Sequence, residues 1–84
     1  MEMRSTRFTA TLEQWQAELG LSHQDFMAFL GGRGADEWAH YRAGRRDPSE
    51  SFVRAARRKA RAVAPEWLAR LDAAYQEDAL LRVS

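Results

Sequence analysis

The chain has 84 residues, of which 13 are Lys or Arg and 12 are Asp or Glu, so its formal net charge is +1. This length allows one small domain with a modest core. The chain contains no cysteine, which excludes disulfides and thiolate metal sites and favours an intracellular compartment. No apolar run reaches the roughly 18 residues of a membrane-spanning helix, and the N-terminus lacks a signal-peptide hydrophobic region. We therefore expect a cytoplasmic protein with no membrane partner.

Positive charge is concentrated in one part of the chain. Residues 33–61 contain nine Lys or Arg and four Asp or Glu, a balance of +5, whereas the remaining residues have a balance of −4. Such a segment is typical of a surface that binds anions, but interleaved arginines also occur on ordinary solvated helix faces. Charge counting alone leaves both interpretations open.

The first predicted element is a short helix near the N-terminus. Residues 1–10 have no helical pattern, and we expect them to form a flexible arm. Thr11 and Gln14 fit a capping box, in which the Thr11 hydroxyl accepts from the Gln14 amide and Gln14 reaches back. The helix that follows should run through Leu19, with Gly20 in the left-handed conformation beyond its end.

Two more helices are predicted before Gly44. Ser22 is a suitable N-cap for a helix over residues 23–30. A glycine-rich turn at 32–34 then leads into a third helix at about 35–43. Gly44 is expected to end this helix.

The fourth predicted helix begins at a second capping signal. Asp47 is the expected N-cap, Pro48 would occupy the first helical position, and Glu50 would complete the box. The helix should end near Ala64. Its apolar face follows the helical period and comprises Phe52, Ala56, Ala60 and Val63.

Pro65 breaks the fourth helix and opens a fifth. The apolar face expected for the fifth helix comprises Trp67, Leu68, Leu71, Ala74 and Tyr75. Three further apolar residues follow, Leu80, Leu81 and Val83, and we expect them to form a homodimer interface because a monomer has no reason to keep an exposed apolar patch. A frayed terminus with incidental leucines is the alternative.

These elements predict an all-α fold, a compact four- to five-helix bundle. The expected organisation is a flexible arm at 1–10, a helical domain at 11–64 and a C-terminal helix at 65–84 that serves as a dimerisation element.

An ordered set of residues in the middle of the chain resembles the lambda-repressor/Cro-like helix-turn-helix DNA-binding domain. The set is Gly20-Leu21-Ser22, Phe26, Leu30-Gly31, Trp38, Tyr41 and Gly44-x-Arg46-x-Pro48. The resemblance covers roughly residues 11–64. It implies that the second and third helices form the helix-turn-helix, and that the third enters the major groove of double-stranded DNA.

Carried over residue by residue, the resemblance implies base readout by Ala35, Asp36 and His40. Alanine can touch a thymine methyl, aspartate can accept from cytosine N4, and histidine can donate to guanine N7 or O6. The residues expected to contact phosphates are His23, Arg33, Arg42, Arg45 and Arg46. Such modules usually dimerise on palindromic sites, so the expected protein is a nucleoid-associated transcriptional regulator that acts as a homodimer.

A second hypothesis is a protein-interaction module on a helix-turn-helix scaffold that has lost DNA binding. Asp36 and Glu37 favour it, because carboxylates at the start of the third helix would oppose phosphates. An enzyme is not expected. His23 and His40 lack metal-ligand spacing and a third ligand, Ser22 and Ser49 are explained by capping, and no cofactor-binding motif is present.

Overall fold

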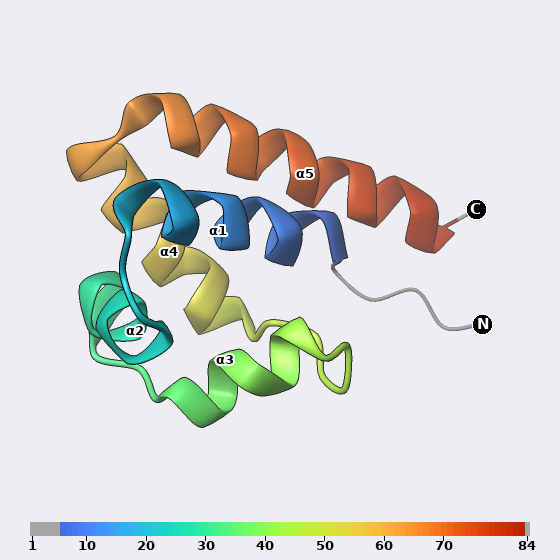
Figure 1. Cartoon of the computed structure of the whole chain (residues 1–84). Helices are drawn as coiled ribbons and strands as arrows, with labels where there is room; N and C mark the ends of the chain where they lie inside the picture. The colour runs from blue at the N-terminus through green and yellow to red at the C-terminus, as the bar shows by residue number, and fades with distance from the viewer. Residues whose placement is uncertain (1–5, 84) are drawn as a thin grey trace.

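The computed structural model describes residues 6–83, which form five helices and no strand (Figure 1). The helices are α1 (Thr6–Leu19), α2 (His23–Gly31), α3 (Ala35–Arg42), α4 (Glu50–Val63) and α5 (Pro65–Val83). The expected all-α helical bundle is therefore confirmed.

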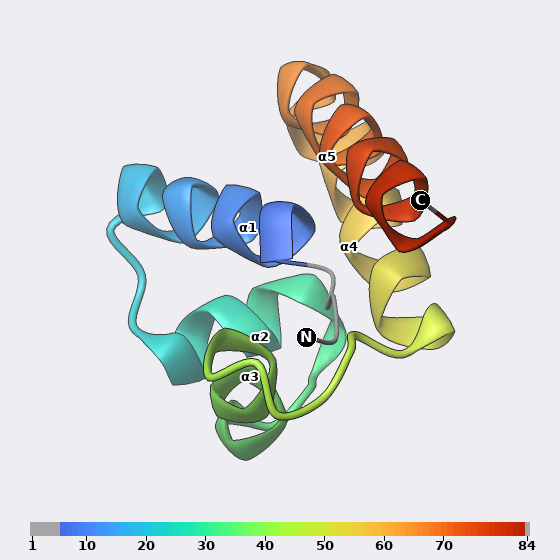
Figure 2. The ribbon, with the colours of Figure 1, turned by 90° about the vertical axis from the view of Figure 1, so that its right-hand side faces the viewer.

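The helices form two groups that meet at α4. In Figure 1, α5 and α1 lie along the upper part of the molecule, and their mutual contact is the most extensive between any two helices. α4 packs against both α5 and α2. α3 contacts α2 and α1 and runs along the lower edge of the molecule, as Figure 1 shows. Figure 2 shows α2 and α3 together below α1.

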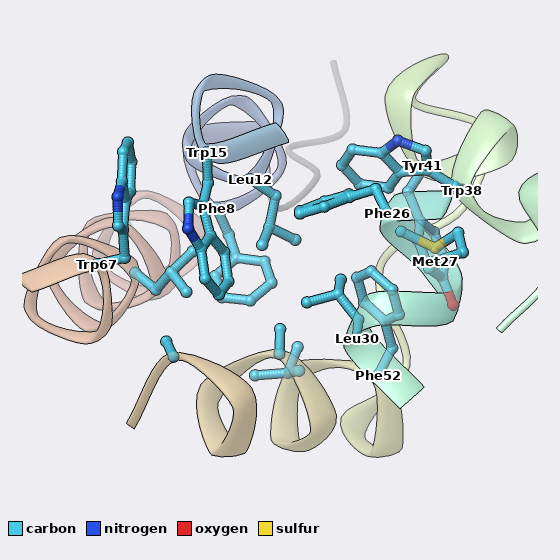
Figure 3. Packing of buried hydrophobic residues seen from close by; sticks show 14 of the residues in the cluster. Phe8, Leu12, Trp15, Phe26, Met27, Leu30, Trp38, Tyr41, Phe52 and Trp67 are labelled. Carbon is cyan, nitrogen blue, oxygen red and sulfur yellow. The ribbon is translucent and has the colours of Figure 1, made fainter. Parts of the chain in front are cut away.

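The core is built largely from aromatic side chains (Figure 3). Neighbouring rings run from Trp67 of α5 through Trp15 and Phe26 to Trp38 and Phe52, with centroid separations of 6.1, 5.9, 5.8 and 6.1 Å. All five side chains are buried. Because each such ring removes a large apolar area from water, this chain of contacts joins all five helices into one core.

The structure confirms several local signals of the sequence. Ser22 caps α2, since its hydroxyl accepts a hydrogen bond of 3.1 Å from the amide of Asp25. Gly20 and Gly44 have φ values of 69° and 74°, as expected for glycines just beyond helix ends. Pro65 begins α5.

The expected start of α1 is wrong. Residues 6–10 belong to α1 rather than to an arm, and Phe8 is completely buried. Thr11 is not a cap: it lies inside the helix, where its hydroxyl donates to the carbonyl of Arg7 at 2.8 Å. The rest of the predicted arm, residues 1–5, lies outside the described residues.

α1 begins earlier because its N-terminus is capped from α5. Asp78 is 2 % exposed, and its two carboxylate oxygens accept from the backbone amides of Arg7 and Phe8 at 3.1 and 3.0 Å. A carboxylate at this position satisfies helix-terminal donors and favours the positive end of the helix dipole. The residue that sets the start of α1 therefore lies at the other end of the chain.

The predicted cap of α4 is also wrong. Ser49, not Asp47, occupies the N-cap position, and its hydroxyl accepts from the amide of Phe52 at 3.2 Å. Pro48 consequently precedes the cap instead of opening the helix. Val63, assigned above to the apolar face of α4, is 55 % exposed, because α4 turns it away from the core at its last residue.

α5 is an integral part of the bundle and packs against α1 and α4. Trp67, Leu71 and Ala74 are buried in the common core, as predicted. Tyr75 is exposed over 41 % of its surface, although the edge of its ring contacts Phe8 at a centroid distance of 5.8 Å. Asp78 of α5, which caps the N-terminus of α1, adds a further contact between these two helices.

Candidate nucleic-acid interface

α2 and α3 are joined by the turn Gly32-Arg33-Gly34. Gly32 has a φ of 77°, and its amide donates to the carbonyls of Met27 and Ala28 at 3.1 and 3.3 Å. The amide of Arg33 also donates to Met27, at 3.2 Å. These bonds satisfy carbonyls at the end of α2 and let the chain turn out of α2 within three residues, which fixes where α3 begins.

Gln16 holds α3 and the start of α2 in place from α1. This side chain is buried. Its Oε1 accepts from the indole N–H of Trp38 at 3.0 Å, and its Nε2 donates to the carbonyl of Leu21 at 3.1 Å. The same Nε2 lies 2.8 Å from Nδ1 of His23. One amide thus positions α3 and the first residue of α2 relative to each other.

Glu37 points its charge toward the protein. Its Oε2 accepts from the Tyr41 hydroxyl at 2.6 Å and lies 3.4 Å from the Arg33 guanidinium. Arg33 also donates to the hydroxyl of Ser51 at 3.0 Å, and the Tyr41 oxygen accepts from the amide of Ser49 at 3.3 Å. Burial, together with the hydrogen bond to Glu37, raises the pKa of Tyr41 above its ordinary value of 10.0. This network ties both ends of α3 to the start of α4.

The outer face of α3 carries the residues predicted to read bases. Asp36 is exposed, while Ala35 and His40 are half-buried. Asp36 and His40 are four residues apart, so they share one face of the helix. Trp38 and Tyr41 are buried on the other side. Of the two carboxylates at the start of α3, only that of Asp36 is therefore directed outward without an internal partner in the described part of the chain.

Cations collect at the C-terminal end of α3. Gly44 turns the chain there, and Arg45 and Arg46 are exposed and form no ion pair with any residue from 6 to 83. The guanidinium of Arg42 lies over the Trp38 ring, 5.7 Å from its centroid. Its Nε is buried and has no hydrogen-bond partner in the described structure. Three arginines thus lie within five residues at one end of the helix.

The structure separates the remaining predicted phosphate contacts from this group. His23 is exposed at the start of α2 and connects to α3 through Gln16. Arg33 lies at the N-terminal end of α3, where it is half-buried and engaged with Glu37 and Ser51. Arg33 therefore serves first to hold the α2–α3 turn against α4.

The predicted dimer residues lie near the end of α5. Leu80 and Leu81 are 67 % and 38 % exposed. They line a shallow surface depression together with Arg7 and Glu77, whose charged groups are 3.9 Å apart. The side chain of Val83 lies outside what the structure describes.

Two residues of this architecture were not predicted. Gln16 lies on the same helical stripe as Leu12 and Trp15, and a polar residue on an apolar stripe signals a buried hydrogen-bonding group. The second is Tyr41, whose hydroxyl donates to Glu37. Its spacing of four from Glu37, and that of Glu37 from Arg33, is the signal that could have revealed the network.

Residues 6–83 contain no group of three or more His, Cys, Asp or Glu side chains placed to hold a metal ion. Within the same range, no helix is both long enough and apolar enough to cross a membrane. Comparisons with family models, curated proteins and solved structures give no match.

Proposed function

We propose that the protein is a small sequence-specific DNA-binding regulator that uses α2 and α3 as a helix-turn-helix and α3 as the recognition helix. The observation that carries the proposal is that the exposed face of α3 is followed by Arg45 and Arg46, which are exposed and form no ion pair within residues 6–83. Base-reading side chains with adjacent phosphate-binding cations are what major-groove recognition requires.

The internal pairing of Glu37 supports this proposal. The sequence places two carboxylates at the start of α3, which would oppose phosphates. In the structure the Glu37 carboxylate is bound to Arg33 and Tyr41, so its charge is largely compensated within the protein. The single outward carboxylate, Asp36, is then available to accept a hydrogen bond from cytosine N4.

In the proposed complex, α3 lies in the major groove. Ala35, Asp36 and His40 face the base edges, where the imidazole donates to guanine. Phosphate contacts come from Arg42, Arg45 and Arg46 at one end of α3 and from His23 at the start of α2. Contacts to phosphate position the domain without reading sequence.

We further propose that the regulator is associated with the nucleoid and binds a palindromic DNA site as a homodimer. Leu80 and Leu81 support this, because both are exposed apolar residues that lie side by side beside the Arg7–Glu77 ion pair. An isologous contact would bury them and supply the two-fold symmetry that paired half-sites need.

A titration of DNA affinity against salt concentration tests the proposal. Binding of a labelled duplex should weaken steeply with salt, because neutralised phosphates release counterions. Replacing Arg45 and Arg46 with alanine should weaken binding to all sequences about equally and make the logarithmic salt slope shallower by about one to two units. The control is Arg58→Ala with Arg61→Ala, which removes the same charge from α4 and should leave most of the slope.

The competing function is a protein-interaction module, and the exposed carboxylate of Asp36 is the observation that favours it. The same titration separates the two functions. Absence of binding to any duplex at low salt would contradict the DNA-binding proposal and favour a protein partner.

A further inference from the structure

A basic groove lies between the C-terminal part of α2 and the exposed side of α4. Its volume is about 540 Å³, which is within the range of typical ligand-binding pockets. Phe29 and Leu30 form the α2 side of its floor, and Ala55 and Ala62 form the α4 side. Of the residues that the sequence predicts to contact DNA, Arg33 is the one among the lining residues of this groove.

Small residues keep the groove open. Ser51, Ala55 and Ala62 follow one another at intervals of four and seven along α4, so they share one helix face. Across from them is Gly31, and a Cβ added there would lie 3.8 Å from the Cβ of Ala55. Side chains of this size leave the α2–α4 contact unfilled at its outer edge, and apolar surface of the floor stays accessible.

The charge of the groove has one sign. Among the described residues, its lining includes four cations, Arg33, Arg54, Arg58 and Lys59, and no carboxylate. Arg33 pairs with Glu37, and Arg54 pairs with Glu50. Arg58 and Lys59 form no ion pair with a residue in the described range 6–83. The groove therefore combines an apolar floor with uncompensated positive charge.

Lys59 and Phe29 indicate which class of ligand fits. The Lys59 ammonium lies 4.7 Å from the centroid of the Phe29 ring, so this ring face is covered and offers no open platform on which a nucleic-acid base could stack. Phosphates alone would also leave the apolar floor uncovered. A ligand that carries both carboxylates and an aliphatic side chain satisfies both features.

We propose that this groove docks an acidic amphipathic helical segment of a partner protein. A leucine-sized side chain of the segment lies on Ala55 and Ala62 of the floor, next to the Phe29 ring that Lys59 covers, and carboxylates on either side of it pair with Arg58 and Lys59. This is the mode in which a helix lays its apolar side chains into a groove. The surface is separate from the face of α3, so the protein can hold a partner whether or not it binds DNA.

The test uses a fluorescein-labelled helical peptide with Leu at positions i and i+4 and Glu at the positions between them, and measures fluorescence anisotropy with the full chain. We expect saturable binding that weakens when the peptide leucines are replaced by serine. Arg58→Glu should weaken binding at least about tenfold, because like charges then face each other. Arg61→Glu is the matched control: it makes the same charge change on an exposed residue of α4 that does not line the groove, and its effect should stay below about threefold.

Three outcomes would overturn the proposal. The first is no binding of the peptide at millimolar concentration. The second is equal weakening by Arg58→Glu and Arg61→Glu, or no effect of the peptide leucines, since either would show nonspecific charge attraction. The third is displacement of the peptide by a short duplex whose binding is itself weakened by Arg58→Glu, which would assign the groove to nucleic acid. Circular dichroism of each variant verifies that the fold is retained.

Discussion

Replacing Asp78 with alanine should destabilise the whole domain, although the residue is near the C-terminus. Its carboxylate accepts from the amides of Arg7 and Phe8 at 3.1 and 3.0 Å and is almost fully buried. The substitution leaves two amides at the start of α1 without their acceptor and removes a negative charge from the positive end of that helix.

The magnitude follows from these contacts. A hydrogen bond to a charged group contributes about 1.5–3 kcal/mol, and loss of an N-cap side chain costs about 0.5–2 kcal/mol. The two contributions describe the same contacts and overlap, so we expect a loss of about 3 kcal/mol in the free energy of unfolding. For a domain of this size, that corresponds to a decrease in Tm of about 10–25 °C.

Guanidinium chloride denaturation, followed through the fluorescence of the three buried tryptophans, measures this loss. Glu77→Ala is the matched control. It removes a neighbouring carboxylate whose partner Arg7 is 3.9 Å away on the surface, and exposed ion pairs contribute about 0–1 kcal/mol. If Asp78→Ala and Glu77→Ala had the same small effect, the assignment of Asp78 as the cap of α1 would be refuted.

Three further predictions concern the core, the alkaline stability and the oligomeric state. Gln16→Leu should lower the free energy of unfolding by about 2–3 kcal/mol in a urea titration, because it leaves the buried indole N–H of Trp38 without an acceptor. The pKa of Tyr41 is higher in the folded protein than in the unfolded chain, so the neutral phenol contributes stability that is fully present below pH 10. This contribution is lost as the pH rises past 10 through the pKa of the folded state. The stability difference between wild type and Tyr41→Phe should therefore shrink at alkaline pH. Sedimentation equilibrium should show a homodimer for the wild type and a monomer for Leu80→Glu with Leu81→Glu.

Each of these predictions has a contradicting result. Gln16→Leu should exceed the effect of Gln14→Leu, an exposed position of the same helix, and equal effects would remove Gln16 from its positioning role. A difference between wild type and Tyr41→Phe that does not change across pH 9–12 would contradict the proposed linkage. A wild-type protein that stays monomeric at high micromolar concentration would disprove the dimer.

Much of the fold could be predicted because its signals are local. Ser22 needs only the amide of Asp25 to act as a cap, and Gly20 and Gly44 need only their own backbone freedom to end a helix. Such features depend on residues within one or two turns. The same holds for the helical period that placed Phe52 in the core.

The predicted starts of α1 and α4 are wrong for different reasons: the residue that caps α1 is distant in sequence, and two residues near the start of α4 could each serve as its N-cap. Asp78 caps α1 across 70 positions of sequence, so the acceptor of the first amides of that helix cannot be identified from the residues near them. Ser49 and Asp47 are both good N-caps, and the hydrogen bond from the Ser49 amide to the Tyr41 hydroxyl adds a tertiary contact that favours the later start.

The candidate site was predictable in its charges and in the local pair Arg33–Glu37, but not in its long-range contacts. Arg33 and Arg45 each follow a glycine in a turn, yet Arg33 is held by Glu37 and Ser51 while Arg45 is exposed. Ser51 is distant from Arg33 in sequence and comes near only when α4 packs on α2. Which cations remain available for a ligand is therefore decided by tertiary packing.

Selection of bound duplexes from a random-sequence pool tests most directly whether α3 reads DNA. The wild type should enrich a palindromic motif, and Asp36→Ala and His40→Ala should each relax preference at particular base pairs, by about 1–3 kcal/mol. Failure of the wild type to enrich any motif, or the same motif in both variants, would contradict recognition of DNA by this face of α3.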